Sequence, residues 1–120
     1  MANTRTTVHG KIEVSPQAVS RVASRAALDT YGVVGLTYPH LRDGLVEVLQ
    51  RESHHKGVEI RQQGEQLVVD LYVVVEYGTP ISEVARNIAS GVKFAVEKAL
   101  GQTVAQVNIN VKGLRVSDRD

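Results

Sequence analysis

Residues 66–77, QLVVDLYVVVEY, decide the fold because their side chains alternate between two different surfaces. One surface is apolar throughout and consists of Leu67, Val69, Leu71, Val73 and Val75. The other surface is mixed and carries Val68, Asp70, Tyr72, Val74 and Glu76. Alternation with period two is typical of a β-strand. The apolar side indicates a strand that packs on helices, and the mixed side indicates a face that is partly open.

Two long helices are predicted, one before this strand and one after it. Ser15 and Pro16 have the residue types of an N-cap and a first helical residue, and apolar residues follow them at helical spacing. Thr79 and Pro80 repeat this signal after the strand, with Thr79 as the expected cap, and Gly101 is expected to end the second helix.

The other predicted elements are shorter: strands at residues 11–14, 58–60 and 107–112, and a short helix from Leu45 to about Glu52. The order is therefore β-α-β-β-α-β with an extra short helix after the first long one. This order predicts an α+β two-layer sandwich, in which two main helices pack on one face of a small mixed β-sheet. The second helix is long enough for a right-handed crossover between parallel strands.

The chain has 120 residues, which predicts one domain over residues 1–120 with flexible ends at 1–7 and 117–120. Its formal net charge of +1 gives no strong field for binding nucleic acid or an anionic membrane surface. It contains no cysteine, which excludes disulfides, thiolate metal sites and thiol catalysis. Its apolar runs are too short to span a bilayer and the N-terminus is polar, so we expect a cytoplasmic protein.

The sequence predicts no catalytic, cofactor-binding or metal-binding residues, and we expect no enzyme. His54 and His55 are neighbours, His40 lies in a different loop, and no acidic residue stands at a metal-ligand spacing from them. His9 has no identifiable partner. Neither a nucleophile elbow nor a phosphate-binding glycine loop occurs. RNA binding is also not expected, since Tyr72 is the only central aromatic on the open strand face.

One surface remains as a candidate interaction face: Val68, Asp70, Tyr72 and Val74, on the open side of the long strand. Two valines and a tyrosine on an uncovered strand face favour contact with another chain. The alternative is that the predicted helix at 45–52, or the chain ends, fold over this face. The sequence leaves both interpretations open.

Several segments together resemble the alkaline shock protein family of bacterial envelope-stress proteins, in its small, single-domain cytosolic branch. The resemblance extends from about Val8 to Val116 and is carried by GKIEVS (10–15), YGVVGL (31–36), DGLVEVL (43–49), GVEI (57–60), VVDLYVVVEYG (68–78) and VNINV (107–111). Ile81, Val84 and Ala85 match as well. The family offers no catalytic residues to transfer to this chain.

The resemblance implies a non-enzymatic protein of cell-envelope homeostasis, located at the inner face of the membrane through a membrane-anchored partner. It also implies partners of three kinds: a membrane-anchored relative, a lipid-metabolic enzyme or further copies of the chain. Our main hypothesis is an interaction protein that binds itself or an envelope-associated partner through its open sheet face. The alternative is an acyl- or lipid-binding module serving a lipid-metabolic kinase. It would need a cavity between the sheet and the alanines of the second helix, which are Ala85, Ala89, Ala95 and Ala99.

Overall fold

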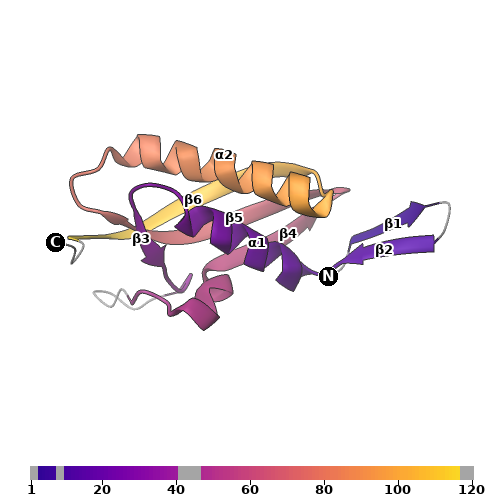
Figure 1. Cartoon of the computed structure of the whole chain (residues 1–120), viewed down its shortest axis with the longest axis horizontal. Helices are drawn as coiled ribbons and strands as arrows, with labels where there is room; N and C mark the ends of the chain where they lie inside the picture. Colours follow the sequence, from indigo (N-terminus) through magenta and orange to yellow (C-terminus); the bar gives the residue numbers. More distant parts are fainter. Residues whose placement is uncertain (1–2, 8–9, 41–46, 117–120) are drawn as a thin grey trace.

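β5 (Gln66–Glu76) is the central strand of the main sheet in the computed structural model, which describes residues 3–7, 10–40 and 47–116 (Figure 1). β4 (Val58–Gln63) pairs antiparallel with the first half of β5, and β3 (Val33–Leu36) pairs antiparallel with its last residues. β6 (Val104–Arg115) runs parallel to β5 along its whole length. Because a strand has two edges, β3 and β4 share one edge of β5 and β6 occupies the other. The predicted mixed sheet is confirmed.

Two helices, α1 (Pro16–Leu28) and α2 (Ile81–Leu100), form the second layer of the fold. They cover the same face of the sheet (Figure 1). Their buried side chains meet the alternate residues of β5 from Leu67 to Val75, which are the apolar side predicted from the sequence. Burial of each such aliphatic side chain contributes about 1.5–3 kcal/mol. The α+β two-layer architecture is therefore confirmed.

The ends of the helices follow local chemistry. The Ser15 hydroxyl accepts a hydrogen bond from the Ala18 amide at 3.1 Å, as an N-cap does. Gly101 ends α2 in a left-handed conformation with a φ of 68°, which glycine adopts without strain. The start of α2 differs from the prediction: Pro80 is the N-cap, and the Thr79 hydroxyl instead donates to the Glu76 carbonyl at 2.7 Å.

The N-terminal residues form a separate two-stranded sheet, which the sequence did not predict. β1 (Asn3–Thr7) pairs antiparallel with β2 (Gly10–Val14), so part of the segment expected to be flexible is a strand. The predicted strand at residues 11–14 is present, but it pairs with β1 and not with the main sheet. The polar, threonine-rich β1 fits a strand since β-branched residues favour this conformation. Residues 117–120, also expected to be flexible, lie outside the described residues.

The predicted short helix from Leu45 to Glu52 is wrong. Leu45 and Val46 lie outside the described residues, and residues 47–50 have no helical structure. A 3-10 helix, η1 (Arg51–Gly57), follows instead. The Leu49 amide donates to the Leu36 carbonyl at 2.7 Å, and the Leu49 side chain is buried in the core. Attachment to β3 and burial of Leu49 therefore override the helical spacing of the apolar residues.

Candidate interaction face

The face of the main sheet that points away from α1 and α2 is called the helix-free face below. Strand register places on it side chains from β4, β5 and β6: Glu59, Arg61, Val68, Asp70, Tyr72, Val74, Gln106, Asn108 and Asn110. The four residues predicted as an interaction face are therefore brought together on this face. Polar side chains from β4 and β6 lie between and beside these four residues, so the helix-free face is a mixture of polar and apolar groups.

The predicted exposure of this face is wrong for its two valines. Val68 is 2 % exposed and Val74 is 0 % exposed. Asp70 is also nearly buried, at 8 % exposure, whereas Tyr72 is half-buried. Since neither valine belongs to the core beneath the helices, both are buried on the helix-free side.

The burial of Val74 has a local explanation in Val48. Val74 is paired across the sheet with Gly35, which has no side chain to protect it. A Cβ atom on Gly35 would lie 2.5 Å from Cγ1 of Val48, so the Val48 side chain fills the space above this glycine. Val48 therefore covers the Val74 end of the face, in line with the alternative that the sequence left open, although the residues around Val48 are not helical.

Asp70 is the centre of a polar network that joins three strands. Nε and Nη2 of Arg61 lie 3.1 and 3.0 Å from its Oδ2 atom. The Asn108 amide donates to its Oδ1 atom at 2.7 Å, and Gln106 donates to Asn108 at 2.9 Å. Both carboxylate oxygens of Asp70 thus have charged or amide donors, which compensates the burial of its charge.

Tyr72 forms a second polar group with Glu59 of β4. The Tyr72 hydroxyl donates to Oε1 of Glu59 at 2.9 Å, and Nε2 of His40 lies 3.9 Å from the other oxygen of this carboxylate. Burial raises the pKa of Tyr72 above its ordinary value, and the hydrogen bond and charge of Glu59 raise it further. The phenol therefore stays a neutral donor at physiological pH.

The histidines do not assemble a metal site in the part of the chain that the structure describes. His54 and His55 lie on η1, and His40 lies beside Glu59. No group of three histidine, cysteine, aspartate or glutamate side chains suited to hold a metal ion occurs among residues 3–7, 10–40 and 47–116. His9 lies outside the described residues.

Sequence reasoning missed the residues that complete the helix-free face. Glu59 and Arg61 alternate with Val58 and Ile60, and Asn108 alternates with Val107 and Ile109. This alternation predicts that the polar side chains of each strand lie on the side of the sheet opposite the core. The pairing register that sets Asp70 between β4 and β6 is needed to see that they meet.

The side chains of this face can recognise a partner through hydrogen bonds. Arg61 keeps 58 % of its side chain exposed although it binds Asp70, and Gln106 is exposed at the other side of the face. Arginine and tyrosine, which flank Asp70 here, are enriched at protein–protein interfaces. The arrangement therefore has the composition of an interaction surface.

The chain matches a family model over residues 4–116: the alkaline shock protein 23 (ASP23) family, which is described as having a cell envelope-related function. The chain belongs to the ASP23 family. The family resemblance predicted from the sequence is thereby confirmed. Helices long and apolar enough to cross a membrane are absent from the described part of this ASP23-family chain.

Relatives of this ASP23-family chain include proteins of Bacillus subtilis and Streptococcus pyogenes. The uncharacterized protein YloU of Bacillus subtilis is 44 % identical over 113 residues, which cover 93 % of this chain and 94 % of YloU. The uncharacterized protein Spy1614 of Streptococcus pyogenes is 36 % identical over 111 residues, or 92 % of each chain. A stress response regulator gls24 homolog of Streptococcus pyogenes is 24 % identical over 115 residues, covering 93 % of this chain and 63 % of the homolog.

Solved structures of MamM-CTD share the fold. One superposes with a TM-score of 0.50 at 17 % sequence identity, covering 82 % of this chain and 98 % of MamM-CTD. At this level of identity the likeness concerns the backbone architecture alone.

Proposed function

We propose that this ASP23-family protein is a non-enzymatic interaction protein of cell-envelope homeostasis and stress response. It binds a second copy of itself or an envelope-associated protein through the helix-free face. The family description gives the cell envelope as the setting. The observation that carries the proposal is the Arg61–Asp70–Asn108 network beside Tyr72, on a sheet face that neither α1 nor α2 covers.

Membrane association in this proposal is indirect. The protein is cytoplasmic and reaches the inner face of the membrane by binding a membrane-anchored relative or a lipid-metabolic enzyme. The near-balanced charge of 14 Lys and Arg against 13 Asp and Glu supports contact with a protein over direct adsorption to anionic lipid.

The alternative acyl-binding function depended on a cavity between the sheet and the alanines of α2, and the packing of α2 does not support such a cavity. The side chains that α2 buries are Val84, Ile88, Val92 and Val96. Its alanines lie elsewhere: Ala85, Ala89 and Ala95 are half-buried and Ala99 is exposed. Branched side chains, and not alanines, therefore fill the space between α2 and the sheet, so we do not pursue this alternative.

Site-specific photo-cross-linking in the native host tests the proposal. A photoreactive residue at Gln106 reports on the helix-free face, and the same residue at Arg86, exposed on α2, is the matched control. We expect a discrete cross-linked product from position 106 and none from position 86, with the partner identified by mass spectrometry. Cross-linking that is absent from position 106, or equal at both positions, contradicts the proposal.

A charge substitution gives an independent readout. Gln106→Arg adds a charge at an exposed position, so it should leave the fold intact while it abolishes partner capture. Arg86→Gln should retain capture. An unchanged thermal unfolding curve for both variants shows that any loss comes from the surface.

A further inference from the structure

A groove lies beside α1, and none of the residues that line it belongs to the helix-free face. Its volume is about 560 Å³, within the range of small-molecule sites. α1 forms one wall, and η1 with β3 forms the other. The lining residues are Arg21, Ser24, Arg25, Leu28, Asp29, Val34, His54 and His55.

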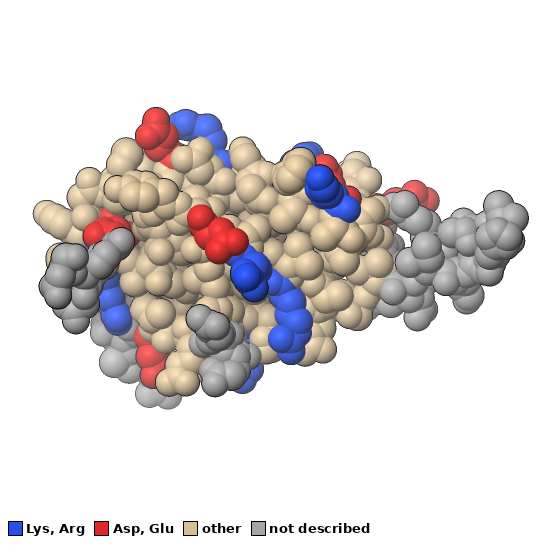
Figure 2. All heavy atoms as spheres, in the orientation of Figure 1, with Lys and Arg blue, Asp and Glu red and all other residues tan. Residues whose placement is uncertain are grey.

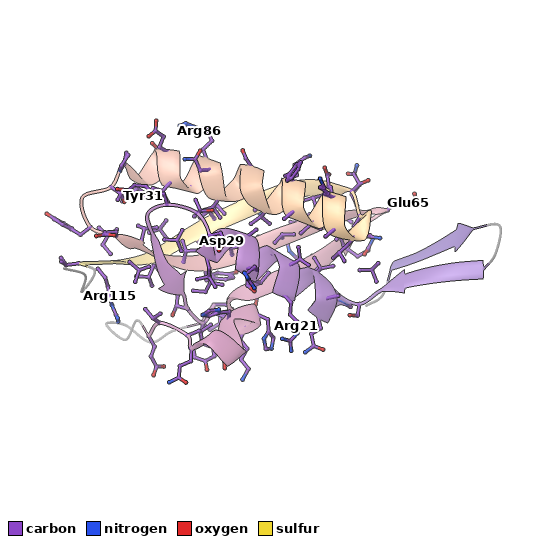
Figure 3. The ribbon with its side chains drawn as sticks, in the orientation of Figure 1. Arg21, Asp29, Tyr31, Glu65, Arg86 and Arg115 are labelled. Atoms are coloured by element: carbon purple, nitrogen blue, oxygen red, sulfur yellow. The ribbon has the colours of Figure 1, made fainter. Side chains whose placement is uncertain are left out.

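The groove concentrates nitrogen donors. Arg21 and Arg25 are one helical turn apart on α1, and His54 and His55 face them from η1. Among the lining residues that the structure describes, Asp29 is the only one with an acidic side chain. Figure 2 shows basic side chains beside an acidic one at the centre of the face that carries α1, and Figure 3 shows Arg21 directed from α1 toward the η1 side.

Internal ion pairs do not account for the two arginines. Arg25 lies 3.9 Å from Asp29, and both side chains are more than 70 % exposed, which makes this pair weak. Among the described residues, none forms an ion pair with Arg21. Like charges at this spacing destabilise an isolated helix by about 0.2–0.5 kcal/mol. Arg25 lies in the last turn of α1, where a positive charge is favourable, but the helix offers no comparable reason for Arg21 beside the same cavity.

We propose that this groove binds a phosphate monoester group, carried by a small soluble ligand or by a lipid headgroup. A guanidinium group presents parallel N–H donors that match the oxygens of a phosphate, and two of them balance its two negative charges. The imidazoles of His54 and His55 supply further donors from the opposite wall. The apolar side chains of Leu28 and Val34 provide contact for the organic part of the ligand.

Titration of the full chain with inorganic phosphate tests this site. Amide resonances of residues 21–29 and 54–55 are followed by two-dimensional NMR at constant ionic strength. We expect saturable shifts at these positions, and an affinity about tenfold lower in the Arg21→Gln/Arg25→Gln double variant. Arg86→Gln, which removes an exposed arginine on α2, is the matched control and should bind as the unmodified protein does.

Vesicles distinguish the two sources of phosphate. Co-sedimentation with phosphatidylcholine vesicles that contain phosphatidic acid, lost in the double variant but kept in Arg86→Gln, supports a lipid headgroup. Phosphate-induced shifts without co-sedimentation support a soluble phosphate ester. The proposal is overturned if phosphate up to about 10 mM produces no shifts and vesicles are not bound, or if Arg86→Gln loses as much binding as the double variant. Either result leaves the cross-linking test of the helix-free face unaffected.

Discussion

Gly35 shows how a single missing side chain shapes the helix-free face. The substitution Gly35→Ala would place a Cβ atom 2.5 Å from Cγ1 of Val48, which is closer than side-chain atoms pack. We expect the variant to lose about 1–3 kcal/mol of unfolding free energy, since overpacking displaces a fitted neighbour. Urea denaturation measures this loss.

The chain offers a control for this substitution at Gly91. A Cβ atom there would meet nothing within 4 Å, and the residue lies inside α2. Gly91→Ala should therefore stabilise the protein by about 0.5–1 kcal/mol through helix propensity. Adding Val48→Ala to Gly35→Ala should recover part of the lost stability. Equal effects of the two glycine substitutions would show that Val48 does not occupy the space above Gly35.

Tyr72 provides a pH-dependent signature of the same face. Because burial and Glu59 raise its pKa, the folded protein binds the phenolic proton more tightly than the unfolded chain does. The stability from this proton is fully present below the ordinary tyrosine pKa of about 10 and is lost as pH rises through the higher folded value. In an ultraviolet titration of the folded protein, we expect one tyrosine to ionise later than the others.

Two phenylalanine substitutions assign this late component. Tyr72→Phe should remove it, and Tyr77→Phe should leave it in place, since Tyr77 is 69 % exposed. If the late component persists in Tyr72→Phe, the hydrogen bond between Tyr72 and Glu59 does not govern the ionisation.

At the scale of single elements, the long strand and both long helices were predictable from the sequence. β5 has an uninterrupted apolar side, and Ser15 and Gly101 are strong signals of helix ends. The segment at residues 47–57 was not predictable, because its conformation depends on the hydrogen bond between Leu49 and Leu36. A contact between distant segments leaves no periodic pattern in the sequence.

The candidate site was predictable in its location but not in its exposure. Alternation assigns Val68 and Val74 to the face opposite the core, and the structure places them there. The exposure of a side chain on this face depends on its neighbours in the adjacent strand and on any segment that covers the sheet. Val74 is paired with Gly35, and the Val48 side chain lies above this glycine. The polar network around Asp70 likewise depends on strand register, which side-chain periodicity alone does not determine.

At the scale of the whole molecule, the β1–β2 hairpin is set apart from the two-layer body. Figure 1 shows it projecting from one end, and the molecule measures 53 × 26 × 24 Å along its principal axes. The hairpin forms its own sheet and shares no strand pairing with the main one. Val14, the last residue of β2, packs against the core of the two-layer body. The N-terminal segment therefore contacts the core close to the start of α1.

This arrangement predicts that the body folds without the hairpin. Deleting residues 1–10 should change the unfolding free energy by less than about 0.5 kcal/mol, because the deletion retains Val14 and the N-cap of α1. Ser15→Ala in the full chain should instead cost about 1 kcal/mol, since it removes the hydroxyl that accepts from Ala18. Urea denaturation of both variants compares the two effects. A deletion that costs more than the Ser15 substitution would mean that the hairpin packs on the body or on a second copy of the chain, and the size of the assembled species at matched concentration would separate these two cases.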